Sequence, residues 1–472
     1  MSDKMSGWRG RYWGRWYKNL TPDAAAPASE TPAPELGEIL ERARAAAQAG
    51  DKGALKALVD VALPVAGGGV ASLLELGAFA RDFGLFDEAQ NVCRKVMREN
   101  PDEPRAVLDF GYVCLNSGRH SDAIGPFRDY LGRHYNSHLA RVLARILYLC
   151  GAINEADNLI ASLRADPDAL KHGMEVHAFG RYVDVFGLSA ARAMLDRVHR
   201  RVGHAEPSEV ADRILAAKAE RRPFALIRLG DGEGACIRLD PGDEASYGPI
   251  YAQNRQEMIS IWFGPEIDSV GSGFDRLCCG LSDLVAECDL VGIPYPSWIE
   301  HEFRIGSVRG IPSILNVLRL LDRDAERFAD TTTCTQQIHI DLGQREFFDP
   351  LLRGEDIGVV SCFAELGPRL QERFGVRSVD FHKLPGERMS AALIGEEAVA
   401  GRHYPDVFEA TMERLSQPHH GRIFLVAGGI LGKFYARQIR RNGGIALDIG
   451  SLADGWLAKG TRPGQDMWTR PL

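Results

Sequence analysis

The chain has 472 residues, of which 45% are hydrophobic and 25% are charged, so it can form two or three globular domains. Its formal net charge of −8 argues against general nucleic-acid binding, which needs a basic face. No apolar run is long enough to span a bilayer, and the nine scattered cysteines without zinc-type pairing favour a reduced cytoplasm.

The first 20 residues interleave aromatic and basic side chains. The aromatic residues are Trp8, Tyr12, Trp13, Trp16 and Tyr17, and the basic residues are Arg9, Arg11, Arg15 and Lys18. Such a segment can dock on an anionic membrane surface, which would make the protein peripheral at the inner membrane. It can equally bind a partner or fold back on the chain. Because 21–35 is rich in Ala, Pro, Ser and Thr, residues 1–35 are predicted to form a basic aromatic N-terminus and a flexible linker.

Residues 36–205 carry a repeated helical pattern. Gly84, Gly118 and Gly151 each begin a six-residue stretch that ends in alanine, and they lie 34 and 33 residues apart. A period of 34 residues is typical of tetratricopeptide repeats, in which each unit is a helix–turn–helix pair. Stacked repeats usually recognise peptides or other extended partners, and no convincing catalytic set occurs in this region.

From residue 207 to residue 472, short apolar runs alternate with helical patterns. This alternation indicates a mostly parallel sheet with helices on both faces. The predicted strands are 224–228, 289–294, 337–341, 356–361 and 378–384, with two more at the starts of 422–440 and 443–451.

Two acidic residues follow the first of these strands. The apolar run from Phe224 ends at Arg228, and Asp231 and Glu233 come next, separated by Gly232. Ligands bind at the carboxyl edge of open α/β sheets, and residues i and i+2 of an extended segment point to the same side. The two carboxylates can therefore face one divalent cation that neutralises a diphosphate. The alternative is a polar turn, because Gly-Asp-Gly is a common turn signal.

A second candidate site lies near the end of the chain. Residues 427–433 read Ala-Gly-Gly-Ile-Leu-Gly-Lys and match neither a dinucleotide fingerprint nor a P-loop fully. Backbone amides at a helix N-terminus, together with Lys433, nevertheless favour an anion, unless the glycines serve only tight packing. His382 ends a strand and is either a contact for the diphosphate or acceptor, or a buried structural histidine. The candidates for hydroxyl binding, ring stacking or proton transfer after the last strand are Asp448, Ser451, Asp454 and Trp456.

The stretches 228–233, 427–433 and 447–456 resemble those of the GT-D type glycosyltransferases, a family of nucleotide-sugar-dependent enzymes with an Asp-x-Glu metal motif. The resemblance covers residues 207–472. It implies a Rossmann-like α/β glycosyltransferase domain with a mostly parallel sheet, preceded by the tetratricopeptide-like helical array. It also implies a bacterial-type enzyme that transfers a sugar from a nucleotide-diphosphate donor to a protein or glycan acceptor, which the repeats would contact.

The resemblance carries over the two metal carboxylates directly, and the identity of the acceptor base stays open; the remaining roles are expected from the residues themselves. Asp231 and Glu233 would hold Mn²⁺ or Mg²⁺, and with Asp454 they are the expected catalytic residues. The expected donor-binding residues are Arg228, Gly230, Gly428, Gly429, Lys433, Asp448, Ser451, Trp456 and His382. Two other functions stay open: a scaffold or binding protein whose α/β domain has lost catalysis, and an NAD-dependent enzyme, which the broken fingerprint disfavours.

Overall fold

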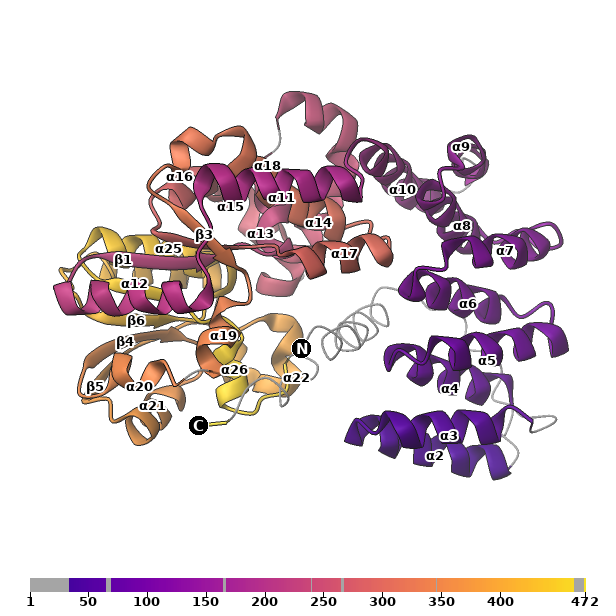
Figure 1. The fold of residues 1–472 in the computed structure, drawn as a ribbon, viewed down its shortest axis with the longest axis horizontal. Helices are drawn as coiled ribbons and strands as arrows, with labels where there is room; N and C mark the ends of the chain where they lie inside the picture. Colours follow the sequence, from indigo (N-terminus) through magenta and orange to yellow (C-terminus); the bar gives the residue numbers. More distant parts are fainter. Residues whose placement is uncertain are drawn as a thin grey trace. The chain divides into compact units, whose positions relative to one another are not determined.

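The computed structural model describes residues 34–64, 69–163, 167–238, 240–264, 267–344, 346–461 and 471–472. These residues form two compact units (Figure 1). The first unit contains the described residues up to Val185 together with Glu300–Val308, and the second contains Phe186–Ile299 and Arg309–Leu472. The basic aromatic segment 1–20 lies outside the described residues. None of the helices in the described ranges has both the length and the apolar character that crossing a bilayer requires.

The first unit is helical, and its helices are paired. Its elements are α2 (Pro34–Ala49), α3 (Lys52–Ala62), α4 (Val70–Asp82), α5 (Phe86–Glu99), α6 (Pro104–Ser117), η1 (His120–Ala123), α7 (Ile124–Leu131), α8 (Ser137–Leu149), α9 (Ile153–Ser162) and α10 (Pro167–Val185). Gly84, Gly118 and Gly151 make turns between successive helices with φ angles of +70°, +76° and +77°. Only glycine adopts such angles without steric cost, which explains why the glycines recur at this spacing. The predicted helix–turn–helix pairs are confirmed.

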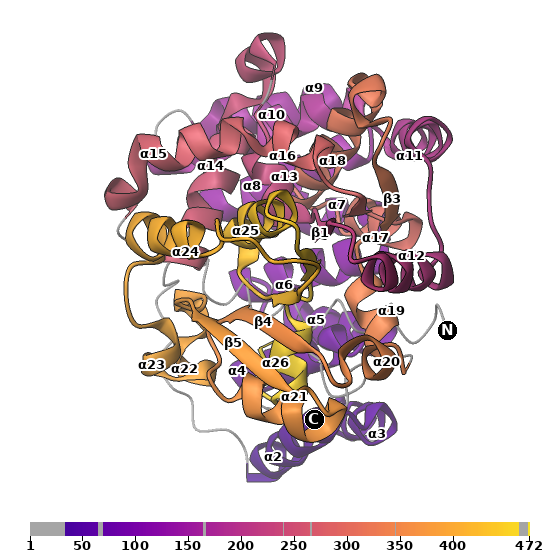
Figure 2. The ribbon, with the colours of Figure 1, turned by 90° about the vertical axis from the view of Figure 1, so that its left-hand side faces the viewer.

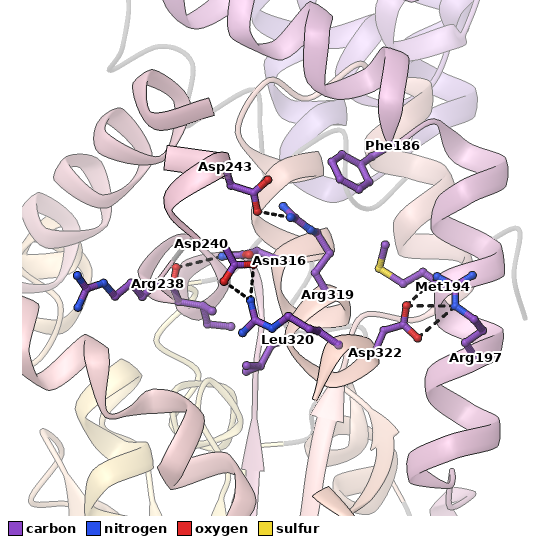
Figure 3. Close-up of a pocket in the computed structure, with 12 residues that line it drawn as sticks. Phe186, Met194, Arg197, Arg238, Asp240, Asp243, Asn316, Arg319, Leu320 and Asp322 are labelled. Atoms are coloured by element: carbon purple, nitrogen blue, oxygen red, sulfur yellow. Dashed lines mark hydrogen bonds and ion pairs between the residues drawn. The ribbon is translucent and has the colours of Figure 1, made fainter. Parts of the chain in front are cut away.

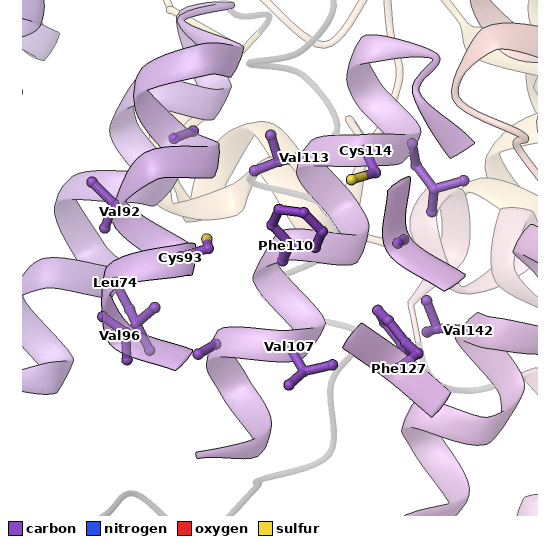
Figure 4. Close-up of a cluster of buried hydrophobic side chains, with 14 of the residues drawn as sticks. Leu74, Val92, Cys93, Val96, Val107, Phe110, Val113, Cys114, Phe127 and Val142 are labelled. Carbon is purple, nitrogen blue, oxygen red and sulfur yellow. The ribbon is translucent and has the colours of Figure 1, made fainter. Parts of the chain in front are cut away.

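Apolar side chains of successive helices form the core of this unit. Phe110 of α6 and Phe127 of α7 lie in one buried cluster with Val142 of α8 (Figure 4). A Cβ atom on Gly111 would lie 2.6 Å from the Phe127 ring, so glycine is needed for this close approach of α6. The helices are therefore held by interlocking side chains rather than by helix propensity alone.

A short segment from the second half of the sequence packs into the first unit. Arg145 of α8 is buried and donates a hydrogen bond from Nε to the Gly306 carbonyl (2.7 Å) and another from Nη2 to the preceding carbonyl (2.6 Å). His120 donates from Nε2 to the Arg304 carbonyl at 2.6 Å. These carbonyls lie at the end of α17 (Pro296–Arg304), where the helix leaves them without internal partners and where its dipole favours a cation.

The second unit is an α/β domain. Its strands are β1 (Phe224–Arg228), β2 (Leu290–Ile293), β3 (Thr332–Thr335), β4 (Asp356–Ser361), β5 (Ser378–Lys383), β6 (Ile423–Val426) and β7 (Ile445–Asp448). The helices before β4 are α11 (Leu188–Val202), α12 (Pro207–Glu220), α13 (Asp231–Cys236), α14 (Pro241–Phe263), α15 (Ile267–Cys279), α16 (Leu281–Ala286), the start of α17, α18 (Gly310–Arg323), η3 (Ala325–Phe328), α19 (Ile338–Gln344) and α20 (Phe348–Leu352). The later helices are α21 (Leu366–Phe374), η4 (Arg388–Ser390), α22 (Ala391–Ile394), α23 (Glu396–Val399), η5 (His403–Val407), α24 (Phe408–Arg414), α25 (Gly429–Arg441) and α26 (Leu452–Trp456).

The seven strands form one parallel sheet in the order β3-β2-β1-β7-β6-β4-β5. In the centre of the sheet, Leu226 of β1 pairs with Leu290 of β2 on one side and with Leu447 of β7 on the other. Helices α12, α19, α20, α21 and α26 bury apolar side chains in a common core with the strands, and α25 packs against β1, β6 and β7 (Figure 2). This is the Rossmann-like α/β architecture expected from the alternating pattern.

Two predictions about the elements were wrong. The predicted strand 337–341 belongs to α19, where Ile338 and Leu342 are buried one helical turn apart, and the third strand is instead the threonine-rich β3. Helix α11, assigned to the repeats on the sequence, belongs to the second unit. Its Arg197 makes a bidentate ion pair with Asp322 of α18 (3.1 and 2.7 Å).

We expect Arg145→Met to loosen the segment Glu300–Val308. The variant keeps much of the apolar side chain but removes both hydrogen bonds to the carbonyls, and bonds from charged donors contribute about 2 kcal/mol each. The amides of Ile305 and Ser307, which bond within this segment, should exchange at least about 30-fold faster by hydrogen-exchange mass spectrometry. Arg128→Met, which removes an exposed ion pair with Glu155, is the control and should leave this exchange unchanged. Unchanged exchange in Arg145→Met would show that the two bonds do not hold the segment.

Candidate functional site

The carboxyl ends of the two central strands bring opposite charges together. β1 ends at Arg228 and β7 ends at Asp448, and because these strands are parallel neighbours both ends lie at the same edge of the sheet. Arg228 Nη2 lies 3.1 Å from Asp448 Oδ1, and the Arg228 backbone N–H donates to Asp448 Oδ2 at 3.2 Å. Both side chains are buried. The pair therefore interacts in a medium where charge–charge attraction is strong.

A lysine and a glutamate complete this cluster. Lys433 projects from the second turn of α25, and its Nζ lies 3.0 Å from Asp448 Oδ2 and 2.7 Å from Glu233 Oε1 of α13. Only 3% of Lys433 is exposed. We call Arg228, Glu233, Lys433 and Asp448 the edge network. Its two cations balance its two carboxylates, as buried charges require.

The network fixes the protonation of its members. Burial alone would raise the pKa of Asp448, but Arg228 and Lys433 outweigh burial and lower this pKa to about 2. Burial would likewise lower the pKa of Lys433, but Asp448 and Glu233 reverse the effect and raise it. Asp448 and Lys433 therefore stay charged throughout the physiological range.

Two glycines make room for the Arg228 guanidinium. A Cβ on Gly450 would lie 1.9 Å from Arg228 Nη2, and one on Gly292 would lie 3.0 Å from Arg228 Cγ. Arg228 Nη1 lies 3.0 Å from Nδ1 of His339 on α19, while Ser451 Oγ lies 3.4 Å from His339 Nε2. Burial and then Arg228 hold the pKa of His339 well below its usual value, so the imidazole is neutral and accepts a hydrogen bond from the arginine.

The acidic motif after β1 is helical, not extended. Helix α13 begins at Asp231, so the expectation that the two acids belong to an extended segment was wrong. Glu233 instead accepts a hydrogen bond from the Gly230 backbone N–H on Oε2 (2.9 Å), which caps the helix, and contacts Lys433 with Oε1. The side chain of Asp231 lies outside the described part of the chain.

The described side chains do not form a ready metal site. No group of three or more His, Cys, Asp or Glu side chains in the described ranges is placed to share a cation. Both oxygens of Glu233 are already engaged, and the Asp448 carboxylate contacts two cationic side chains. A divalent ion at Glu233 would therefore have to replace Lys433.

The N-terminus of α25 lies beside the network. The helix begins at Gly429, whose φ is +55°, and no described side chain caps it at Gly428. Lys433 donates from Nζ to the Gly429 carbonyl at 3.0 Å, which ties the network to the first turn of this helix. The first backbone N–H groups and the helix dipole favour an anion there, as the sequence predicted for the glycine turn.

Two tryptophans that the sequence analysis did not select lie against these glycine turns. A Cβ on Gly232 would lie 2.8 Å from the Trp262 ring, and one on Gly429 would lie 3.6 Å from Trp262 Nε1. Trp262 of α14 therefore lies next to the N-termini of both α13 and α25. Trp298 of α17 lies close to Gly230. No local pattern marks either residue, because their positions follow from tertiary packing.

Other predicted donor contacts lie elsewhere. Trp456 is buried in the core, with its ring centroid 5.0 Å from that of Phe348, so the prediction that it stacks on a ligand was wrong. His382 is a buried residue of β5, and its described contacts are the Phe424 ring (6.2 Å) and the Asp380 carboxylate (3.5 Å). This agrees with the structural alternative for His382, whose pKa is lowered chiefly by burial.

Asp454 remains near the carboxyl edge of the sheet. It lies in α26 and accepts a hydrogen bond from Thr461. Its negative charge also acts on Cys362, which follows β4 directly. Burial raises the pKa of this thiol to about 12, and the charge of Asp454 adds to the increase. Asp454 thus stays a candidate for chemistry near the edge.

In comparisons with known proteins, no protein-family model and no curated protein matches the chain.

Asp448→Asn should strongly destabilise the second unit. The variant leaves two buried cations with one carboxylate, and removing one partner of a buried pair costs about 3–5 kcal/mol. We expect the amides of β1 and β7 to exchange rapidly at a much lower urea concentration in this variant than in wild type. Asp349→Asn, which breaks an exposed pair with Arg353, is the matched control and should behave as wild type. Equal urea dependence in both variants would contradict the role of the network in stability.

His339 should make the second unit sensitive to mild acid. Above pH 6.5 the imidazole is neutral in both the folded and unfolded states, but below this pH only the unfolded state binds the proton. The free energy of unfolding is therefore highest above the pKa of the unfolded state. It decreases as the pH is lowered below that value, by up to about 1.4 kcal/mol per pH unit. His339→Gln keeps an acceptor for Arg228 but removes the titrating group. Between pH 7 and 5.5 its free energy of unfolding, measured from the urea dependence of hydrogen exchange, should decrease less than that of wild type. Identical losses would show that folding does not lower the pKa of His339.

Proposed function

We propose that the second unit is a nucleotide-sugar-dependent glycosyltransferase and that the edge network, with the helix N-termini beside it, is its donor site. The observation that carries this proposal is the pairing of two buried cations with the buried Asp448 and the partly buried Glu233 at the carboxyl edge of a parallel sheet. Open α/β sheets bind their ligands at this edge. The resemblance to the GT-D type enzymes in 228–233 and 427–433 supports the same assignment.

The diphosphate of the donor would lie at the start of α25. Its first backbone N–H groups have no described side-chain cap at Gly428, and the 13-residue helix adds its dipole. Lys433 is close to this turn and is positively charged. These groups would stabilise the negative charge that develops on the leaving diphosphate.

Trp262 is the proposed platform for the base or sugar of the donor. It is half-buried, and it lies against Gly232 and Gly429 at the two helix N-termini. Aromatic faces stack on nucleobases with about 1–3 kcal/mol per base. The carboxylates of Glu233 and Asp448 would accept hydrogen bonds from ribose or sugar hydroxyls.

In the proposed reaction, the bond from the anomeric carbon to the diphosphate oxygen breaks and a bond to the acceptor oxygen forms. The acceptor hydroxyl loses its proton to a carboxylate. Asp448 is a poor proton acceptor because its pKa is about 2, so it would bind rather than act as the base. Asp231 and Asp454 are the proposed candidates for the base.

The expected Mn²⁺ or Mg²⁺ enters no step of this proposal. Glu233 is occupied by Lys433 and by the Gly230 backbone N–H, so the described donor set does not fit a bound ion without rearrangement. The metal stays a prediction that rests on the resemblance, with Asp231 as the other ligand.

We further propose that the helical unit binds the acceptor or a protein partner, as tetratricopeptide-like repeats do. All nine cysteines are free, which supports the reducing cytoplasm as the compartment of this enzyme, and its bacterial type rests on the resemblance. Docking of residues 1–20 on the inner membrane or on a partner stays a prediction. The rival proposals are a scaffold that binds a nucleotide sugar without turnover and, less well supported, an NAD-dependent enzyme.

A binding and turnover panel tests the proposal. The full chain is titrated with UDP-, GDP-, CMP- and dTDP-sugars and with NAD, and release of the nucleotide is then measured. We expect one nucleotide sugar to bind and Trp262→Leu to weaken binding about tenfold, because the stacking platform is lost. Tyr135→Leu, which removes an exposed ring of the helical unit, is the control and should bind as wild type. Binding of NAD alone, or of no member of the panel, would refute the proposal.

Carboxylate variants test the role given to Glu233 and the predicted metal. Glu233→Gln should lower nucleotide release about 100-fold or more while Glu287→Gln, at an exposed ion pair with Arg441, changes it little. Binding without turnover in wild type would favour the scaffold. Asp231→Asn and removal of divalent ions by EDTA test the metal: turnover that withstands both would contradict the metal prediction while leaving the transferase proposal intact.

A further inference from the structure

The second unit contains a cavity of about 260 Å³ away from the edge network (Figure 3). It is lined by side chains of α11 and α18, by the start of α14 and by the segment that joins α13 to α14, and it includes no member of the network. Asn316 of α18 forms part of its wall and donates from Nδ2 to the carbonyls of Gly234 (3.0 Å) and Ile237 (3.1 Å). The cavity wall is thereby attached to the end of α13.

The polar part of the lining consists of ion pairs whose geometry is fixed. Arg197 and Asp322 form the bidentate pair between α11 and α18, and Arg323 Nη1 lies 2.6 Å from both oxygens of Asp240. A carboxylate has about four acceptor sites and a guanidinium has five donors. Arg323 also donates to Asp324 from Nε (3.2 Å) and Nη2 (3.0 Å), so most of its donors are used, but each pair still keeps a donor and an acceptor site beyond these bonds.

A third pair joins the polar part to an aromatic ring. Arg319 contacts Asp243, and its guanidinium lies over the ring of Phe186, 4.6 Å from the centroid (Figure 3). Met194 and Leu320 add apolar surface to the same cavity. The lining thus presents apolar groups beside planar hydrogen-bonding groups.

We propose that this cavity binds an uncharged, hydroxyl-rich ligand of the size of one sugar ring. Adjacent hydroxyls of such a ring donate to a carboxylate and accept from its paired guanidinium, while the C–H surface of the ring packs on apolar side chains. Pockets for drug-sized ligands measure about 300–1,000 Å³, so a cavity of about 260 Å³ suits a single ring.

The charge balance favours a neutral ligand over an anion. Four arginines line the cavity (Arg197, Arg238, Arg319 and Arg323), against three aspartates (Asp240, Asp243 and Asp322). Each aspartate neutralises one arginine, and the fourth arginine, Arg238, is exposed and donates to Cys279 Sγ at 3.3 Å. A phosphate would have to compete with three carboxylates for arginines that are already paired, whereas a polyol brings no charge and can bond to both members of a pair.

Saccharide binding to the full chain tests the proposal without any assumption about transferase activity. Glucose, galactose, mannose, N-acetylglucosamine and rhamnose, with phosphate and pyrophosphate as anionic probes, are tested by calorimetry and saturation-transfer NMR. We expect one neutral sugar to bind and Asp240→Asn and Arg323→Gln each to weaken it at least tenfold. Both residues are about half exposed, so these variants should fold. The matched controls, Asp349→Asn and Arg353→Gln, alter an exposed pair outside the cavity and should bind as wild type.

The outcomes separate this cavity from the proposed donor site. Loss of sugar binding in Asp240→Asn and Arg323→Gln, with nucleotide-sugar binding unchanged, supports the cavity, and Trp262→Leu should retain the free sugar. Three results would overturn the inference: no neutral sugar binds, only the anions bind, or the two cavity variants bind the sugar as tightly as wild type. If only the nucleotide-sugar panel fails, the proposal of a sugar-binding cavity is unaffected.

Discussion

Lys433 is held between the carboxylates of Glu233 and Asp448 inside the α/β unit, and Arg228 reaches Asp448 from the other side. These four residues come from β1, α13, α25 and β7. One cluster of charges therefore joins the first strand of the sheet and the helix after it to the last strand and the helix before it. A buried cation cannot be left without its partners except at a cost of several kcal/mol. The relative position of α13 and α25 therefore depends on this cluster.

The same constraint shapes what chemistry the edge of the sheet can perform. A carboxylate whose pKa is about 2 is a fixed negative charge, suited to orienting a ligand and unsuited to taking a proton. The neutral His339 behind Arg228 holds the guanidinium by accepting from it rather than by adding charge. Proton transfer at this edge must therefore be carried by groups other than Asp448 and His339.

Buried strands such as β1 and β4 were predictable because parallel strands covered on both faces are continuous apolar runs. The helix at 338–344 was not, because a short segment with alternating isoleucines fits either period, and only packing decides. Arg228, Lys433 and Asp448 could be selected because strand ends and glycine turns mark the ligand edge in sequence. Trp456 and Trp262 could not be told apart, since one ring fills the core and the other lies at the helix N-termini through contacts distant in sequence.

The segment Glu300–Val308 has a consequence for the order in which the protein forms. The ribosome releases the N-terminal helices first, and domains generally fold as they emerge. Arg145 nevertheless finds its two carbonyl partners only after the chain has been extended beyond Gly306, when β1 and β2 have already been synthesised. The helical unit therefore cannot complete its packing when its own helices emerge, and its last step waits for a segment that is synthesised more than a hundred residues later.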